Sequence, residues 1–343
     1  MVKKVLIILC VLLPSVMSGA DWGDGVVLDS VMATEAESFL RSMPDGLQAR
    51  QERAVRSAVA GDVAPLAGVR VLRNTDVGVI DGVEAVNLVG GRYRLYKPAG
   101  VLDEKLPLLV YLHGGGWCFG SINSCSRFCM ELTREARIAV LAVEYPLAPE
   151  NPYPSALDCC VEAVEFSWDN ASEYGFDRAN ISIGGDSSGG NLALATALRL
   201  KSTPVKMVKS VVTFYPVTKA WNDGSDSWRQ YGGGYGLDSG IMEAFNDAYA
   251  AGGDVRSPYI SPCNASLSQL AGFPPVLMIN AEKDILRDQG QEMCDRLSQA
   301  GIEVAHIVLP GTVHLFITVP GQDAAFAESV SMTAKFLTGM ARR

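Results

Sequence analysis

Short, largely apolar runs recur along the chain, bounded by turn-forming residues and in several cases followed by a segment with helical spacing. The clearest runs are Leu106–Leu112, Asn180–Gly184, Val208–Tyr215, Pro275–Ala281 and Ile302–Leu309. Runs of this length without regular polar alternation are typical of strands buried on both faces. Strands that alternate with helices predict an α/β fold with a mostly parallel sheet.

The segment Gly185–Gly190, with the sequence GDSSGG, follows one of these runs and precedes the Ala- and Leu-rich segment Asn191–Leu198. Its Gly-x-Ser-x-Gly pattern is weakly specific by itself, but strand, turn and helix in this order form the context that a nucleophilic serine needs. Gly185 and Gly189 leave room for a strained turn and for a closely packed helix. Ser187, at the centre of the motif, is the predicted nucleophile.

A second glycine-rich segment, His113–Trp117, follows the run Leu106–Leu112. Glycine runs are more often flexible surface loops, and Gly232–Gly234, which has no strand before it, is interpreted as one. The first segment differs because it lies at the carboxyl end of a strand, where open α/β sheets bind ligands. We expect backbone N–H groups to stabilise an oxyanion there. The predicted donors are Gly115, Gly116 and Ser188, with His113, Gly114 and Asp186 supporting the two motifs.

A serine nucleophile needs a base, and the chain has only three histidines. His306 lies within a predicted strand, where an imidazole is usually an ordinary neighbour. His113 opens the glycine loop, and we expect it to hold the loop by bonding to the backbone. His314 lies in a turn after a strand, where loops carry catalytic groups. His314 is therefore the predicted base.

The third member of such a site is a carboxylate between the serine and the histidine in chain order. Glu282, Asp284 and Asp288 all follow the run Pro275–Ala281. Asp288 falls in the first turn of a predicted helix, where acidic residues commonly complement the helix dipole. Glu282 comes so early that it is interpreted as a surface charge. Asp284, in the turn itself, is the residue predicted to orient His314.

These motifs together resemble the hormone-sensitive-lipase-like branch of the α/β-hydrolases, which includes many bacterial (family IV) carboxylesterases and the arylacetamide deacetylases. The resemblance runs from about Leu106 to Phe316 and more loosely to both ends. The segments that carry it are His113–Gly120, Tyr145–Glu150, Tyr153–Asp158, Gly185–Gly190, Phe273–Pro275, Asp284–Asp288 and Gly311–Phe316.

The resemblance implies an eight-stranded α/β-hydrolase sheet flanked by helices and covered by a helical cap. It implies the same triad, Ser187, Asp284 and His314, and the same three oxyanion donors. The chain departs from the family pattern at Pro146, where Arg is common, at Ile285, where Pro is common, and at Leu315, where Gly often follows the histidine. We expect these departures to change loop geometry and substrate preference rather than remove activity.

Residues 1–20 are interpreted as a secretory signal. Lys3 and Lys4 precede the apolar run Val5–Leu13, and small residues precede a cleavage site after Ala20. An uncleaved anchor is the alternative, but nine apolar residues are too few to span a bilayer. A lipoprotein cysteine at Cys10 is disfavoured by the bulky residue before it. We expect export to the periplasm or the medium, without stable membrane insertion.

Loss of Lys3 and Lys4 takes the net charge from −9 to −11. Such an acidic chain is not expected to bind nucleic acid or anionic membranes, so the expected partner is a small neutral ester. The oligomeric state stays open. The expected chemistry needs no metal and no organic cofactor.

Seven cysteines remain after the predicted cleavage, and most are interpreted as buried small hydrophobes. An odd number leaves at least one free thiol, and the pairing of the others stays open. Cys125 and Cys129 have helical spacing, but no histidine or second close pair completes a metal site. The seven are Cys118, Cys125, Cys129, Cys159, Cys160, Cys263 and Cys294.

Residues 21–343 are predicted to form one hydrolase domain with cap elements at about 30–60 and 221–264. The second segment is long for a plain connection, which favours a lid. Its aromatic residues line an acyl or aryl pocket or simply pack the lid onto the core. They are Trp221, Trp228, Tyr231, Tyr235, Phe245 and Tyr249.

The sequence thus predicts a serine carboxylesterase for small, short-acyl esters, acting through an acyl-enzyme. Deacetylation of arylamides or carbohydrates would use the same residues, and a lipase is a further possibility. A small-molecule receptor of the same fold is the alternative from a different class, and it is disfavoured because the chain keeps every member of the triad.

Overall fold

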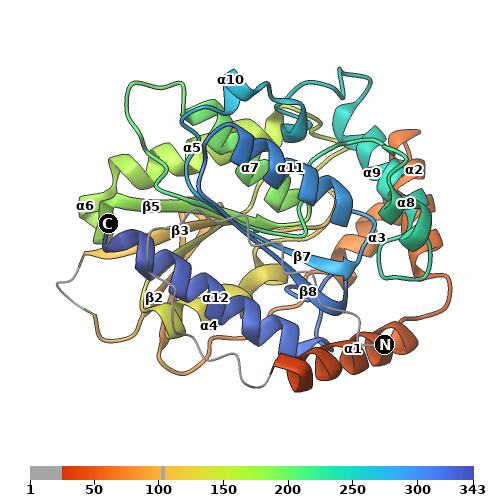
Figure 1. The fold of residues 1–343 in the computed structure, drawn as a ribbon, viewed down its shortest axis with the longest axis horizontal. Coiled ribbons are helices and arrows are strands. Elements are labelled where there is room, and N and C mark those ends of the chain that lie inside the picture. Colours follow the sequence, from red (N-terminus) through yellow and green to blue (C-terminus); the bar gives the residue numbers. More distant parts are fainter. Residues whose placement is uncertain (1–24, 102–104) are drawn as a thin grey trace.

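The computed structural model describes residues 25–101 and 105–343, and its centre is an eight-stranded sheet (Figure 1). The strand order is β1-β2-β4-β3-β5-β6-β7-β8. Pairing is antiparallel from β1 to β2 and from β2 to β4, and parallel between all other neighbours. The predicted eight-stranded, mostly parallel sheet is confirmed. The strands are β1 (Val83–Leu88), β2 (Tyr93–Pro98), β3 (Leu106–Leu112), β4 (Ala139–Val143), β5 (Phe176–Asp186), β6 (Val211–Phe214), β7 (Val276–Lys283) and β8 (Val304–Val313).

Helices cover both faces of the sheet, with α5, α7 and α11 on one side and α4 and α12 on the other (Figure 1). The α-helices are α1 (Gly25–Ser42), α2 (Leu47–Val59), α3 (Ala64–Leu72), α4 (Ser126–Ala136), α5 (Ser155–Asp169), α6 (Ala171–Tyr174), α7 (Ser188–Leu200), α8 (Asp226–Tyr231), α9 (Ser239–Ala250), α10 (Leu267–Leu270), α11 (Arg287–Gln299) and α12 (Asp323–Ala341). Short 3₁₀ helices are η1 (Val89–Gly91), η2 (Ile122–Cys125) and η3 (Pro262–Asn264).

The central strand β3 shows why its sequence is apolar throughout. Leu108 and Val110 belong to the core under α5 and α7, whereas Leu109 and Tyr111 belong to the core under α4 and α12. Successive side chains of a strand point to opposite faces, so a strand covered on both faces needs apolar residues at every position.

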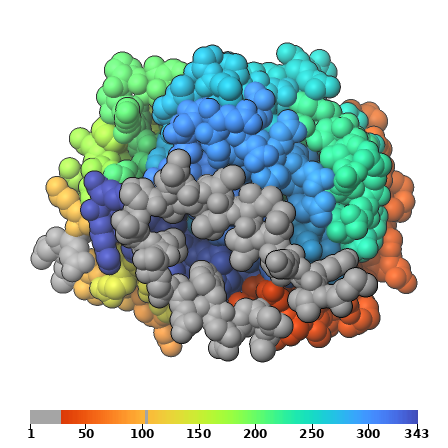
Figure 2. Space-filling view, viewed as in Figure 1, coloured from red at the N-terminus to blue at the C-terminus, as the bar shows by residue number. Residues whose placement is uncertain are grey.

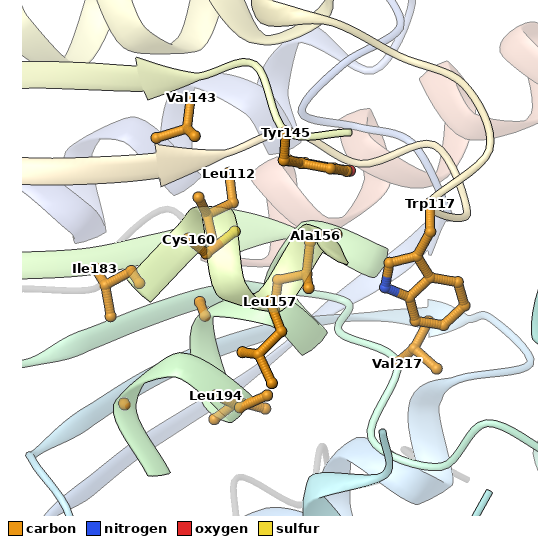
Figure 3. Packing of buried hydrophobic residues seen from close by; sticks show 14 of the residues in the cluster. Leu112, Trp117, Val143, Tyr145, Ala156, Leu157, Cys160, Ile183, Leu194 and Val217 are labelled. Carbon is orange, nitrogen blue, oxygen red and sulfur yellow. The ribbon is translucent and has the colours of Figure 1, made fainter. Parts of the chain in front are cut away.

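The core beside the predicted nucleophile is closely packed. Figure 3 shows Leu157 and Cys160 of α5 and Leu194 of α7 beside the strand residues Leu112 and Ile183. All seven cysteines of the described residues are buried and unpaired, in agreement with their interpretation as small hydrophobes. Among these residues no group of three or more His, Cys, Asp or Glu side chains is placed to hold a metal ion.

The two predicted cap segments differ in what they contact. α2 packs against α9, so the second half of the first segment meets the second segment; Figure 2 shows the orange and green-cyan parts together at one end of the molecule. α1 instead packs along β8 and α12, with Ala33 tight against Gly311. The first half of the predicted cap segment therefore covers the edge of the sheet.

The predicted signal segment, residues 1–20, lies outside the described residues. Within the described ones, no helix combines the length and the apolar character that crossing a bilayer requires.

Candidate active site

Ser187 lies at a strained turn between β5 and α7. Its φ is +54° and its ψ −118°, a conformation that L-residues rarely adopt. The flanking glycines are needed because the backbones approach too closely for a side chain. A Cβ at Gly185 would lie 2.4 Å from the Leu112 carbonyl oxygen, and a Cβ at Gly189 would lie 2.0 Å from it. The glycine spacing of the motif is thus a steric requirement of the turn.

His314 and Asp284 meet because of the register between β7 and β8. Lys283 pairs with Val313 at the ends of these parallel strands. The residues that follow them, Asp284 and His314, therefore lie side by side at the carboxyl edge of the sheet. His314 Nδ1 lies 2.6 Å from Asp284 Oδ2, and His314 Nε2 lies 3.1 Å from Ser187 Oγ. The Leu286 N–H donates to Asp284 Oδ1 at 2.9 Å and fixes the carboxylate. All three side chains are buried.

The other carboxylates considered from the sequence contact different groups. Asp288 Oδ2 accepts the Ser227 N–H at 2.7 Å, which ties α11 to α8. Glu282 Oε2 accepts the Gly311 N–H at 2.7 Å, so this residue braces the last part of β8, directly before His314. Glu282 is therefore not the plain surface charge that its position predicted.

The remaining histidines have structural partners. His113 donates from Nδ1 to the Gly114 carbonyl oxygen at 2.8 Å and stacks on Tyr145, whose hydroxyl donates to the His113 carbonyl oxygen at 2.7 Å. Burial lowers the pKa of His113, which favours the neutral ring. His306 lies 3.2 Å through Nε2 from Asn280 Nδ2, and burial lowers its pKa to about 4.

The glycine loop after β3 is held beside the serine by Asp186. Leu112 pairs with Gly185, so the loop and the nucleophile turn leave the sheet together. Asp186 Oδ1 accepts the Gly114 N–H and the Tyr111 hydroxyl, both at 3.0 Å. Burial raises the pKa of Asp186 to about 6 despite these hydrogen bonds, which lower it.

The three predicted oxyanion donors have free N–H groups. Within residues 25–101 and 105–343, no acceptor takes the N–H of Gly115, Gly116 or Ser188. The Gly115 carbonyl instead accepts the N–H groups of Cys118 and Phe119, at 3.1 and 3.0 Å, which closes the loop and leaves its donors available.

Two residues that sequence reasoning missed hold the His314 turn. Gln322 accepts the Val313 N–H at 3.0 Å through Oε1 and donates from Nε2 to the carbonyls of Val313 and His314, both at 3.2 Å. The Tyr215 ring lies 4.3 Å from the His314 ring, and its hydroxyl accepts the Ile317 N–H at 3.1 Å. Gln322 is buried and only eight residues beyond His314, but a lone glutamine there forms no motif that would have identified it.

Two of the three departures from the family pattern lie directly beside the triad residues His314 and Asp284. Leu315 has a φ of +79°, in the region that favours glycine. This leucine therefore holds a backbone conformation that suits the glycine common at this position in the family. Ile285 is fully buried between Asp284 and α11, and its carbonyl accepts the Ser227 hydroxyl at 2.8 Å. Nothing in the structure explains Pro146.

Ser187 and His314 line a cavity of about 530 Å³ together with Gly114, Gly115 and Gly116. Helices α1 and α2 and the segment around α9 form its outer wall. Of the six aromatic residues proposed from the sequence, only Phe245 lines it. Tyr249 stacks on Trp117 at 4.4 Å, and Arg256 lies over the Trp221 ring at 3.8 Å. For Tyr249 the packing interpretation is correct, whereas the contact of Trp221 lies within the second cap segment itself.

A family model described as alpha/beta hydrolase fold matches residues 109–318. The chain belongs to the alpha/beta hydrolase family. The resemblance to its hormone-sensitive-lipase-like carboxylesterases is confirmed. The matched region includes Ser187, Asp284 and His314, so the family assignment and the geometry concern the same part of the molecule.

Curated relatives are esterases and hydrolases of the same kind. Carboxylesterase NlhH of Mycobacterium tuberculosis is 33% identical over 69% of this chain and 74% of its own length. Ethyl acetate hydrolase of Pseudomonas putida is 36% identical over 65% of this chain and 70% of its own. A putative alpha/beta hydrolase of Acanthamoeba polyphaga mimivirus is 33% identical, and the matched region covers 65% of this chain and 64% of that protein.

The fold is also shared over nearly the whole chain with a solved structure. A thermostable esterase from Pseudomonas putida superimposes with a TM-score of 0.74 at 27% identity, covering 89% of this chain and 94% of that one.

Proposed function

We propose that this alpha/beta hydrolase is a serine carboxylesterase that cleaves small, short-acyl esters through an acyl-enzyme on Ser187. Carboxylic ester hydrolysis is the activity named for its relatives in Pseudomonas putida and Mycobacterium tuberculosis, and on that ground the chain is a carboxylic ester hydrolase. The single observation that supports the finer proposal is the chain of contacts from Asp284 through His314 to Ser187, at 2.6 and 3.1 Å.

In the proposed first half-reaction, Ser187 Oγ attacks the ester carbonyl carbon while its proton passes to His314 Nε2. Asp284 accepts from His314 Nδ1, which keeps Nε2 free as the acceptor and stabilises the imidazolium that forms. The tetrahedral intermediate collapses as His314 returns the proton to the leaving alcohol. The acyl group then remains on Ser187.

In the second half-reaction a water molecule takes the place of the alcohol. His314 accepts its proton, the hydroxide attacks the acyl carbon, and the acid leaves as Ser187 regains its proton. The N–H groups of Gly115, Gly116 and Ser188 are the proposed donors to the oxyanion in both halves. Loss of one such donor costs about 3 kcal/mol in the transition state.

The small-ester preference is supported by the similarity to ethyl acetate hydrolase and by the position of Phe245. A Cβ at Gly116 would lie 2.3 Å from the Phe245 ring, so this ring closes directly over the oxyanion loop. The Phe245 ring thus fills the space beside Gly116 and narrows the cavity on that side. The export expected from residues 1–20 remains part of the proposal and would place the enzyme outside the cytoplasm.

The test combines turnover with covalent labelling. We expect the purified protein to hydrolyse 4-nitrophenyl acetate and to take up one fluorophosphonate adduct, which peptide mapping locates on Ser187. Ser187→Ala should lose both properties. Ser329→Ala, a buried serine on α12 that bonds only the Ala325 carbonyl, is the matched control and should keep both.

Hydrolysis at wild-type rates by Ser187→Ala would refute the proposal, and binding without turnover or labelling would favour a receptor. The matched anilide of the same acyl group separates an esterase from an amidase. An esterase should cleave the ester with the higher kcat/KM.

A further inference from the structure

One part of the wall of the cavity above Ser187 carries a group of polar residues. Helices α1, α2 and α9 contribute both apolar residues, among them Phe39, Leu47 and Ile241, and the polar residues Ser42, Gln48 and Gln51. The segment from the end of α3 to the start of α4 contributes the apolar residues Leu72, Val77 and Phe119 together with a polar group, here called the polar side. The polar side is formed by Arg73, Asn123, Ser124, Ser126 and Arg127.

The polar side is a built surface in which the two segments are joined. The Ser124 hydroxyl donates to the Arg73 carbonyl oxygen at 3.2 Å, and Asn123 Nδ2 donates to Asn74 Oδ1 at 2.7 Å. Asn74 also accepts the Ser121 hydroxyl at 2.8 Å. These contacts hold the backbone of Arg73 and do not involve its side chain, and Arg73 lines the cavity.

The two arginines on this side differ in their partners. Arg127 is neutralised by Asp323 at 2.9 Å and lies 4.1 Å from the centre of the Phe326 ring. The guanidinium of Arg73 has no ion pair and no hydrogen bond to any described residue. The Phe119 ring lies 5.5 Å from its central carbon.

Among residues 25–101 and 105–343, no carboxylate forms an ion pair with Arg73. Burial lowers the pKa of its guanidinium. A guanidinium keeps its proton in proteins, so the group stays positive and incompletely solvated. A partly desolvated cation without a counterion is unfavourable, and a ligand that brings the counterion removes that penalty.

Phe119 connects this cation to the reactive centre. Its N–H donates to the Gly115 carbonyl oxygen at 3.0 Å, so Arg73 lies against the same loop that carries the oxyanion donors. Arg73, Phe119 and Ser187 all line one cavity. A substrate that fills this cavity would therefore meet both Arg73 and Ser187.

We propose that Arg73 binds a free carboxylate of the substrate, so that the enzyme prefers esters carrying a carboxylate over neutral esters of the same shape. A single guanidinium fork matches the two oxygens of a carboxylate and can donate two parallel hydrogen bonds to them. The proposal rests on the proposed esterase function and names its substrate class. It replaces the neutral ligand expected from the net charge, because that charge is screened beyond about 8 Å whereas Arg73 acts at contact distance.

The experiment compares pairs of esters that differ only in carboxylate against carboxamide. On the acyl side the pair is the mono-4-nitrophenyl ester of adipic acid and that of adipic acid monoamide. On the alcohol side it is 3-acetoxybenzoate and 3-acetoxybenzamide, with all rates corrected for spontaneous hydrolysis. We expect a preference for the carboxylate of about 10- to 100-fold in kcat/KM in one of the pairs.

Arg73→Gln should abolish this preference, because the carboxylate ester then gains no more from the site than the carboxamide does. Arg73→Lys, which keeps the charge but not the fork, should retain part of it. Arg127→Gln is the matched control and should keep the full preference. Because contact is electrostatic, 1 M salt should reduce the preference of the wild type.

In the kinetic experiment, two outcomes overturn the inference: a ratio near one for both pairs in the wild type, or equal losses in Arg73→Gln and Arg127→Gln. Hydrolysis of the carboxamides with a ratio near one rejects the subsite and keeps the esterase, whereas no turnover of any ester rejects the esterase. Calorimetric binding of the same esters to Ser187→Ala, with and without Arg73→Gln, judges the subsite independently of turnover. Equal affinity for carboxylate and carboxamide there would overturn it.

Discussion

Leu315 gives the sharpest prediction about stability, because the residue directly after His314 holds a backbone conformation that suits glycine. Its φ is +79°, where an L-residue is less stable by about 1–2 kcal/mol. Its side chain is partly buried beside Ala36, Phe39 and Val313. Replacing Leu315 therefore changes packing and backbone strain together, and the two effects must be separated.

Comparison of Leu315→Gly with Leu315→Ala separates them, since both variants lose nearly the same packing. Glycine removes the strain but loses more conformational freedom on folding, by about 0.5–1 kcal/mol relative to alanine. We therefore expect Leu315→Gly to be more stable than Leu315→Ala by about 1 kcal/mol. At Leu267, an exposed residue at the start of the short helix α10, the order should reverse by about the same amount.

Urea unfolding of the four variants measures these differences from the midpoint and the slope. The sign is the decisive result, because a positive φ is the only feature that predicts opposite orders at the two sites. If Leu315→Gly proves less stable than Leu315→Ala, as at Leu267, the backbone at Leu315 is not strained and the reasoning is refuted.

The remaining predictions concern the site and the pH dependence of stability. Asp284→Asn should lower kcat about 10⁴-fold because His314 loses its orienting acceptor. The control Asp288→Asn should change kcat only a few-fold. Similar losses of kcat in the two variants, measured by steady-state kinetics, would contradict the assignment of Asp284 to the triad. Gln322→Ala leaves backbone groups of Val313 and His314 without partners and should reduce the free energy of unfolding by about 1–3 kcal/mol. We also expect kcat to fall by a larger factor than KM changes. Urea unfolding and steady-state kinetics measure the two effects, and an unaltered unfolding midpoint would rule out the bracing role. Burial lowers the pKa of His306 to about 4, so the unfolded chain binds the proton that the folded chain resists, and stability falls as the pH drops from about 6.5 to about 4. His306→Gln should flatten this decline by on the order of 1 to 3 kcal/mol, measured as the difference between unfolding free energies at pH 7 and pH 4.5; parallel curves for the two proteins would be the contrary result.

Sequence pattern determined the local elements near the site and the identity of its chemical groups. β3 begins and ends at the predicted residues, and α11 begins one residue after the predicted Leu286. The run predicted at 208–215 forms a strand only over Val211–Phe214, because pairing with β5 and β7 limits it to these residues. Such agreement is expected where burial on both faces leaves a clear apolar run.

Only the tertiary structure decided how these groups meet. The contact between Asp284 and His314 follows from the pairing of Lys283 with Val313, and a shift of one residue would direct each side chain to the other face. The bracing by Gln322 and the lack of a partner for Arg73 among the described residues have no signature in the sequence pattern. The left-handed backbone of Leu315 has one only through the glycine that the family commonly has at this position. Hydrophobic periodicity shows which face of an element is buried, whereas the side-chain contacts of Gln322 and Arg73 depend on how the folded chain brings segments together, which register and packing across the sheet determine.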